Sequence, residues 1–182
     1  MASPPTSWKP CAIHELQAHL GNFTDWILCG GHSIDLLVGS HTRGHGDIDI
    51  GVFRSRLTEC LEAIGKDRVF LCSAGAHIQW PGDNIDPAIH DIWISDPSHE
   101  HWIFQIMVYD DQGDTVSYRR DKRITWKKSS HSIQLGDIRI LNPAITLLYK
   151  TNKPPLADKE AADVSTLIEF CGARDITHLD GL

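Results

Sequence analysis

The chain has 182 residues, of which 41% are hydrophobic and 23% are charged, as expected for one globular domain with or without a small appendage. The net charge of -7 argues against non-specific binding of nucleic acids, so we expect no nucleic-acid partner. No apolar run approaches the roughly 18 residues of a membrane span, and the opening stretch MASPPTSWKP has no apolar signal core. We therefore expect a cytoplasmic protein with no membrane partner.

Apolar periodicity and turn residues divide the chain into short elements. In the first part we expect a helix at 12–20, a strand at 26–29, a helix at 33–38, a loop at 40–46, a strand at 47–53 and a helix at 55–65. In the second part we expect strands at 69–72, 91–94, 102–109 and 138–141 and helices at 142–150 and 158–170. The order predicts an α+β fold in which helices pack on a small mixed β-sheet.

Two aspartates, Asp47 and Asp49, lie one residue apart in an apolar strand. Because alternate residues of a strand point the same way, both carboxylates are expected on one face, while Ile48 and Ile50 point to the core. Two neighbouring carboxylates repel each other unless a cation lies between them. Hard oxygen ligands on a strand suit Mg²⁺, which completes its coordination shell with water and substrate phosphate. The pair therefore predicts a metal site.

Gly30 and Gly31 precede the short helix and allow a phosphate to approach the backbone. A helix that begins near Ser33 offers free N–H groups and the positive end of its dipole to an anion. With the paired aspartates, this arrangement predicts phosphoryl or nucleotidyl transfer. We do not expect a structural zinc site, because no H-E-x-x-H motif occurs and glycines beside His41 and His45 disfavour a helix there.

The stretch GGHSIDLLVGSHTRGHGDIDI resembles the signature of the DNA polymerase β-like nucleotidyltransferase superfamily, most closely that of the small aminoglycoside and lincosamide nucleotidyltransferases of bacterial resistance. The matching residues are Gly30, Gly31, Asp35, Gly39, Thr42, Arg43, His45, Asp47 and Asp49. The resemblance is strongest over 25–65 and continues more weakly through HDIWI, WIFQIMV, YRRDKRI and NPAITLLYK. It implies a polymerase β-like nucleotidyltransferase core at 1–140 and a short C-terminal helical segment at 141–182 packed on it.

The resemblance also implies a reaction. A nucleoside monophosphate, usually AMP from ATP, would move to a hydroxyl of a small molecule such as an aminoglycoside or lincosamide antibiotic, releasing pyrophosphate with the help of Mg²⁺. Asp47 and Asp49 would hold the metal, and Gly30, Gly31 and Ser33 would bind the triphosphate. The resemblance leaves a homodimer open.

Basic side chains are further candidates for nucleotide contacts. Arg43 can clamp a phosphate and His45 can contact the base or the acceptor, or both can equally stabilise their loop. Lys150 and Lys159 can approach the triphosphate, the alternative being that they are solvated. Asp163 is expected to pair with a basic side chain. The cluster of Arg119, Arg120 and Arg123 either receives an anion or forms a solvated loop around Asp121.

The family usually supplies a third carboxylate from a later strand, as a metal ligand or as general base. In WIFQIMVY the aligned position is Gln105, which is neutral and cannot act as a base. Either Asp91 faces the same site across the hairpin, or the metal alone acidifies the acceptor hydroxyl while Gln105 positions it. Two other functions stay open: modification of a macromolecule, as in toxin–antitoxin nucleotidyltransferases, and nucleotide binding by a homologue with impaired catalysis.

Overall fold

A computed structural model describes residues 3–152 and 154–173. The helices are α1 (Leu16–Leu20), α2 (Gly30–Val38), α3 (Leu57–Ile64), α4 (Pro143–Lys150) and α5 (Asp158–Ala173). The strands are β1 (Ser7–Trp8), β2 (Ile27–Cys29), β3 (Asp49–Phe53), β4 (Val69–Ser73), β5 (Ala76–Gln79), β6 (Asp91–Ser95), β7 (His101–Gln112), β8 (Thr115–Ser117), β9 (Thr125–Lys127), β10 (Ser132–Leu135) and β11 (Ile138–Leu141).

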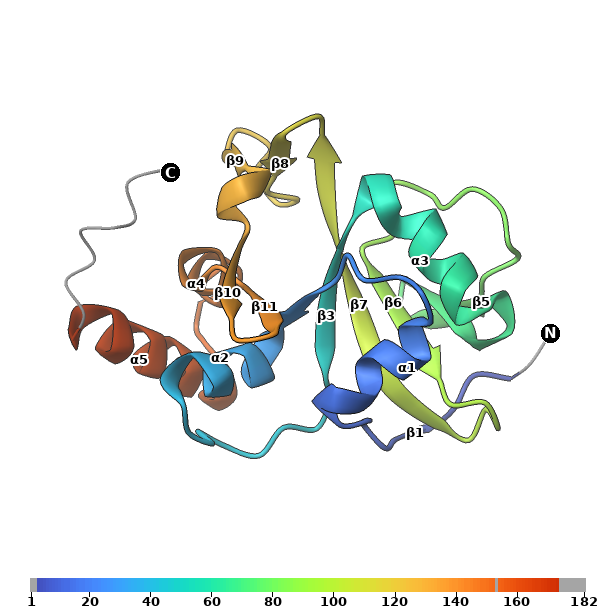
Figure 1. Ribbon diagram of the computed structural model, residues 1–182, viewed down its shortest axis with the longest axis horizontal. Helices are drawn as coiled ribbons and strands as arrows, with labels where there is room; N and C mark the ends of the chain where they lie inside the picture. The colour runs from blue at the N-terminus through green and yellow to red at the C-terminus, as the bar shows by residue number, and fades with distance from the viewer. Residues whose placement is uncertain (1–2, 153, 174–182) are drawn as a thin grey trace.

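The strands form one mixed sheet in the order β10-β11-β2-β3-β7-β6-β4-β5, and β7 also pairs with β1 and β8. The pairs β11–β2, β3–β7 and β1–β7 are parallel, whereas β2–β3 and β6–β7 are antiparallel. Strand β3 therefore lies in the middle of the sheet, between β2 and β7 (Figure 1). The predicted α+β class is confirmed, although the sheet has eleven strands and is larger than expected.

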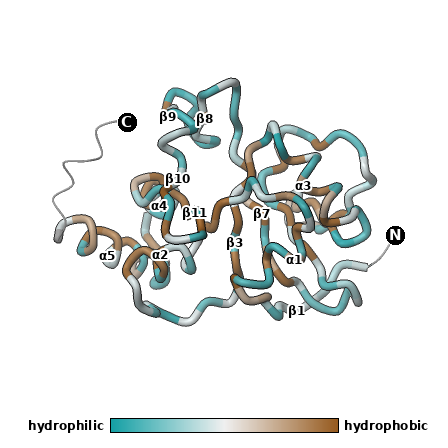
Figure 2. Tube along the Cα trace, in the orientation of Figure 1, coloured by the Kyte–Doolittle hydropathy of each residue, from teal (hydrophilic) through white to brown (hydrophobic). Residues whose placement is uncertain are grey.

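Residues of β3 alternate between two apolar clusters, one on each face of the sheet. Ile50 and Val52 are fully buried with residues of α1 and α3 on one face. On the other face, Phe53 belongs to a second cluster that includes Tyr109 of β7 and Ile145 of α4. Figure 2 shows how hydrophobic residues follow the central strands. Because Asp49 has the same parity as Phe53, its carboxylate opens onto the face covered by α4.

Two predicted boundaries shift at the point where the motifs meet. Helix α2 begins at Gly30 and so includes both glycines, whereas it was expected at residue 33. Strand β3 begins at Asp49, so Asp47 belongs to the preceding loop, although the Ile48 carbonyl still accepts a hydrogen bond from the Gln105 N–H at 2.9 Å. The helix start is therefore further from the aspartates in sequence than predicted, although Gly30 lies directly against Asp49 in space.

Helix α4 packs in the second cluster through Ile145, and α5 contacts both α4 and α2. The proposed boundary at residue 140 stays a prediction, and residues 174–182 of that segment lie outside the described residues. Within 3–152 and 154–173, the helices are all too short or too polar to cross a lipid bilayer.

Candidate active site

The turn from β2 into α2 lies directly against β3. Cys29 pairs with Asp49 across the two antiparallel strands, and Gly30 follows with φ of +65°. A Cβ added at Gly30 would overlap Oδ2 of Asp49, and a Cβ added at Gly31 would overlap the ring of His45. The glycines are therefore required by close approach as well as by backbone conformation, and Asp49 contacts the start of the helix.

The loop between α2 and β3 is held by Asp35. Oδ1 of Asp35 accepts hydrogen bonds from the Thr42 N–H at 2.9 Å and from the Thr42 hydroxyl at 2.5 Å. Oδ2 accepts from His41 Nδ1 at 2.7 Å and from His45 Nε2 at 2.8 Å. Partial burial opposes ionisation, but these hydrogen bonds prevail and lower the pKa of Asp35 to about 2. The carboxylate thus fixes the loop that leads into Asp47.

Asp47 and Asp49 line one cavity of about 330 Å³. Gly31 and Arg43 lie at the same cavity, and Lys150 and Lys159 approach it from the C-terminal helices. Burial, and then the charge of Asp47, raise the pKa of Asp49 to about 7, even though the two lysines act in the opposite direction. The carboxylates share a site in which a further cation would be stabilised.

A buried ion-pair network connects this loop to the C-terminal helices. Asp163 of α5 has only 1% of its side chain exposed, and its carboxylate accepts two hydrogen bonds from Arg43, at 2.8 and 2.9 Å. Lys150 of α4 donates to the same carboxylate at 2.6 Å. Asp163 pairs with basic side chains, as predicted, and its charge holds both cations at the edge of the cavity.

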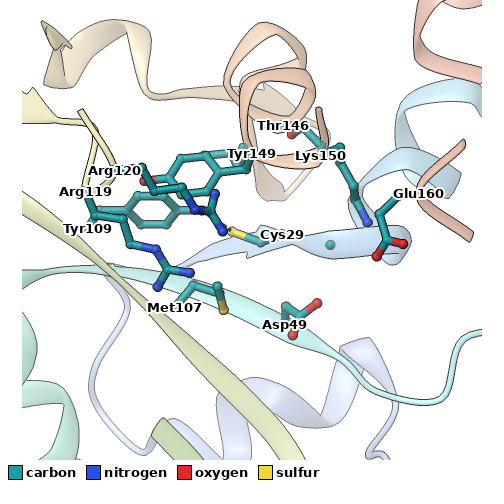
Figure 3. Close-up of a pocket in the computed structure, with 12 residues that line it drawn as sticks. Cys29, Asp49, Met107, Tyr109, Arg119, Arg120, Thr146, Tyr149, Lys150 and Glu160 are labelled. Atoms are coloured by element: carbon teal, nitrogen blue, oxygen red, sulfur yellow. Dashed lines mark hydrogen bonds between the residues drawn. The ribbon is translucent and has the colours of Figure 1, made fainter. Parts of the chain in front are cut away.

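A second cavity, of about 190 Å³, continues from Asp49 on the side away from Arg43. Figure 3 shows Lys150 and Glu160 across from Asp49, with Arg119 and Arg120 further along the cleft. The remaining lining is largely apolar or aromatic and consists of Cys29, Gly30, Met107, Tyr109, Leu141, Thr146 and Tyr149. The guanidinium of Arg120 lies 5.5 Å from the centre of the Tyr149 ring, so it stacks on an aromatic face.

Gln105 and Asp91 lie on the same face of the sheet as Asp49, one and two strands away from it. Gln105 is the direct partner of Asp49 in the parallel β3–β7 pair, and Asp91 stands on the adjoining strand β6, opposite Met107. Gln105 Nε2 donates to Asp91 Oδ1 at 3.4 Å, and Arg119 Nη1 lies 3.7 Å from the same carboxylate. The charge of Asp91 also contributes to the raised pKa of Asp49. A further carboxylate on this face of the sheet therefore comes from β6.

The comparisons with known proteins agree with this geometry. The sequence profile of the aminoglycoside-2''-adenylyltransferase family matches residues 12–75, which include the Gly-Gly turn and both aspartates. The structure of ANT(2")-Ia in complex with adenylyl-2"-tobramycin superposes with a TM-score of 0.55 at 15% identity, covering 88% of each chain. Lincomycin-bound LnuA, a lincosamide antibiotic adenylyltransferase, gives a TM-score of 0.55 at 15% identity over 87% of this chain and 93% of that one. No curated protein sequence matches.

The fold is that of a nucleotidyltransferase. The resemblance that the sequence indicates is confirmed by the family profile and by both structures. The profile covers the Gly-Gly turn and the aspartate pair, whereas the weaker motifs that follow residue 75 lie outside it.

Most of the predicted site residues line the two cavities, namely Gly30, Gly31, Arg43, Asp47, Asp49, Lys150 and Lys159. Ser33, His45, Asp91 and Gln105 do not line these cavities. The Ser33 hydroxyl is buried and donates to the Gly30 carbonyl at 2.8 Å, so it closes the first turn of α2. His45 has only 2% of its side chain exposed and is bonded to Asp35. The triphosphate contact expected of Ser33 and the base or acceptor contact expected of His45 stay predictions, and in this structure both side chains bond to neighbouring residues.

Sequence reasoning missed the aromatic and acidic lining of the second cavity. Tyr149 immediately precedes the predicted Lys150, and Glu160 immediately follows the predicted Lys159, but neither had a motif to mark it. The three arginines predicted as one cluster have different contacts. Arg119 and Arg120 line the second cavity, whereas Arg123 pairs with Asp121 at 2.6 Å.

Replacing Gly30 by alanine tests the close approach at the turn. Gly39 is the matched control, since its φ is +76° but no atom lies within 4 Å of an added Cβ. We expect Gly39→Ala to lower the free energy of unfolding by about 1 kcal/mol, the cost of a left-handed alanine. Gly30→Ala should lower it further and also abolish turnover, because Asp49 must move. Denaturant titration measures both variants, and equal losses of stability would contradict the contact.

Proposed function

We propose that the protein is an Mg²⁺-dependent nucleotidyltransferase that moves AMP from ATP to a hydroxyl group of a small molecule and releases pyrophosphate. One observation carries the proposal. Asp47 and Asp49 share a cavity with Gly31 at the start of α2 and with Lys150 and Lys159. Carboxylates for a metal and positive groups for a triphosphate are thus combined in one place, as nucleotidyl transfer requires.

The donor set fits a magnesium ion. Both carboxylates offer hard oxygen atoms, and burial, then the charge of Asp47, raise the pKa of Asp49, so a bound cation would favour its ionised form. Asp47 and Asp49 would hold the metal, which when bound neutralises charge on the phosphates. Lys150 and Lys159 would add positive charge to the same cavity, and the N–H groups that open α2 would bind phosphate oxygens.

Asp91 is our candidate for the general base. In the reaction, the acceptor oxygen forms a bond to the α-phosphorus of ATP, the bond from that phosphorus to the β-phosphate bridging oxygen breaks, and pyrophosphate leaves. The proton of the acceptor hydroxyl passes to the Asp91 carboxylate. Gln105, which stands between Asp49 and Asp91 and donates to Asp91, would orient this carboxylate.

Replacement of Asp91 by asparagine tests that assignment. We expect kcat to fall about 10²–10⁴-fold, the usual contribution of a general base, while the KM for ATP stays near its original value. Gln105→Ala is the matched control, because it removes the side chain that orients Asp91 but leaves the base, and its effect should be smaller. Steady-state pyrophosphate release measures both. A faster rate for Asp91→Asn than for Gln105→Ala would contradict the assignment.

The charges around Asp91 favour an acceptor with little positive charge. Arg119 lies 3.7 Å from the Asp91 carboxylate and lines the second cavity together with Arg120. An aminoglycoside with several ammonium groups would meet like charge there. Glu160 is the one acid of that lining besides Asp49. We therefore favour a lincosamide-like acceptor, with a sugar hydroxyl and a single amine, over an aminoglycoside.

The function is tested by incubation with ATP and Mg²⁺ in the presence of lincomycin or tobramycin in separate reactions. Pyrophosphate release and the mass of one added AMP on the acceptor are the readouts, and Asp49→Asn is the negative control. We expect product with lincomycin and less or none with tobramycin. Preferential adenylylation of tobramycin would contradict the acceptor class, and acceptor-dependent product from Asp49→Asn would contradict the site.

Gln105 favours a second candidate, a nucleotide-binding homologue with impaired catalysis, because a neutral amide stands beside Asp49. Calorimetry that detects ATP binding, together with no product from any acceptor, would support this candidate. Radiolabelled ATP added to a cell lysate examines modification of a macromolecule, since label would then remain with a large species.

A further inference from the structure

Three histidines surround Asp35 on the side of α2 away from the second cavity. His32 and Asp35 are three residues apart on α2 and so share one helix face. His41 and His45 come from the loop that follows and both donate to Oδ2 of Asp35, at 2.7 and 2.8 Å. The His32 ring lies 4.4 Å from the His45 ring, between centroids. Four potential ligands thus converge from two segments of the chain.

Three of these side chains lie close enough together to hold one ion. One ligand atom each from His32, Asp35 and His45 lies within 4.8 Å of the others. In a tetrahedral zinc site with bonds of about 2.0–2.1 Å, ligand atoms are ~3.3 Å apart. His45 Nε2 lies 2.8 Å from Oδ2 of Asp35, which is already within that spacing. Binding of an ion would replace this hydrogen bond and draw in the His32 ring.

The surroundings of Asp35 already provide the support that a metal ligand needs. Thr42 holds Oδ1 through both its N–H and its hydroxyl, so Oδ2 is turned toward the imidazoles. The side chains of His45 and Asp35 are 2% and 11% exposed, whereas His41 is 70% exposed and leaves an entry path. His32 makes no hydrogen bond to any residue in 3–152 or 154–173, so one imidazole of the cluster is free to bind.

We propose that His32, Asp35 and His45 form a zinc site of two nitrogen ligands and one oxygen ligand, with water in the fourth position, distinct from the Asp47–Asp49 pair. Imidazole nitrogens suit Zn²⁺ and disfavour Mg²⁺, which prefers oxygen, so the two sites select different ions. The zinc ion ties the loop at 40–46 to α2. That loop carries Arg43, which reaches Asp163, and it ends at Asp47. Zinc therefore fixes the position of the segment that presents the active-site carboxylates.

The test uses the full chain, stripped with a chelator and dialysed against Zn²⁺ in excess Mg²⁺ so that oxygen-only sites are filled. We expect one zinc per chain by elemental analysis. The double variant His32→Ala/His41→Ala should retain less than about a tenth of it under limiting zinc. The exposed His14→Ala is the matched control and should bind as the original chain does. Because the His32 side chain makes no hydrogen bond in the described part of the chain, His32→Ala alone provides the test if the double variant fails to fold.

Two further measurements distinguish zinc bound at this site from zinc bound by cysteine thiolates. Co²⁺ in place of Zn²⁺ should give the visible absorption of a tetrahedral site without a thiolate charge-transfer band. Thr42→Val keeps the three ligands but removes the hydroxyl that holds the Asp35 carboxylate, and should weaken binding about tenfold or more. Failure of the original chain to retain zinc, equal retention by the double variant, or a thiolate band would each overturn the proposal.

Discussion

Asp49→Asn abolishes nucleotidyl transfer and, above pH 7, makes the protein more stable. Loss of a metal-binding carboxylate removes several kcal/mol of transition-state stabilisation, which corresponds to a fall in kcat of roughly 10³-fold. The gain in stability follows from burial and from Asp47, which together raise the pKa of Asp49 to about 7. Pyrophosphate release and thermal melting measure the two effects on the same sample.

The pH dependence of that stability has a definite sign. The folded chain keeps the Asp49 proton up to about pH 7, whereas an unfolded aspartate loses it near pH 4. Stability therefore falls as the pH rises between these values, by on the order of a few kcal/mol. The melting temperature of Asp49→Asn should exceed that of the original chain at pH 8 but not at pH 4. Asp114→Asn, at an exposed position, is the control and should match the original chain at both pH values.

Magnesium provides an independent check. A ligand that binds only the folded state raises the melting temperature by mass action. Mg²⁺ should therefore stabilise the original chain at pH 8 and leave Asp49→Asn nearly unchanged. Equal stabilisation of both proteins would place the ion elsewhere.

Asp163→Asn should give the largest loss of stability of any substitution near the site. Removal of one partner from a buried ion pair costs about 3–5 kcal/mol, because the remaining charge is left without compensation. Here two cations, Arg43 and Lys150, would lose a partner whose side chain is 1% exposed. Denaturant titration should show the loss, and kcat should fall too because Arg43 no longer fixes its loop.

The matched control is Asp121→Asn, which breaks the pair with Arg123, whose side chain is 90% exposed. Its stability should stay unchanged, since exposed pairs contribute little. Burial opposes ionisation of Asp163, but hydrogen bonds from Arg43 and Lys150 keep its pKa below the ordinary value. Its contribution is therefore present above about pH 4, the unfolded pKa, and is lost as the pH falls through the folded pKa. A similar loss for both variants would contradict a special role for the buried network.

The local parts of the site could be read from the sequence, because short spacings determine them. Gly30, Gly31 and Asp49 come together since a strand, a tight turn and a neighbouring strand leave few other arrangements. Asn142 followed by Pro143 correctly marked the start of α4, where the Asn142 side chain accepts from the Ala144 N–H at 3.0 Å.

Features that depend on distant contacts could not be predicted. Asp163 was expected to pair with a base, but its partner Arg43 is 120 residues away and no spacing rule connects them. Strands β8 and β9 have three residues each, too few for an alternating pattern to stand out. The histidine cluster was overlooked because His41 and His45 were judged by themselves, while the helix supplies His32 and Asp35.

The Arg43–Asp163–Lys150 network means that the two halves of the sequence are not modular. Expression of residues 1–140 alone would strand the Arg43 guanidinium without its counter-ion and would remove two of the positive groups that line the metal cavity, Lys150 and Lys159. An isolated N-terminal fragment would therefore retain Asp47 and Asp49 but lack the charged side chains of the C-terminal helices that surround them.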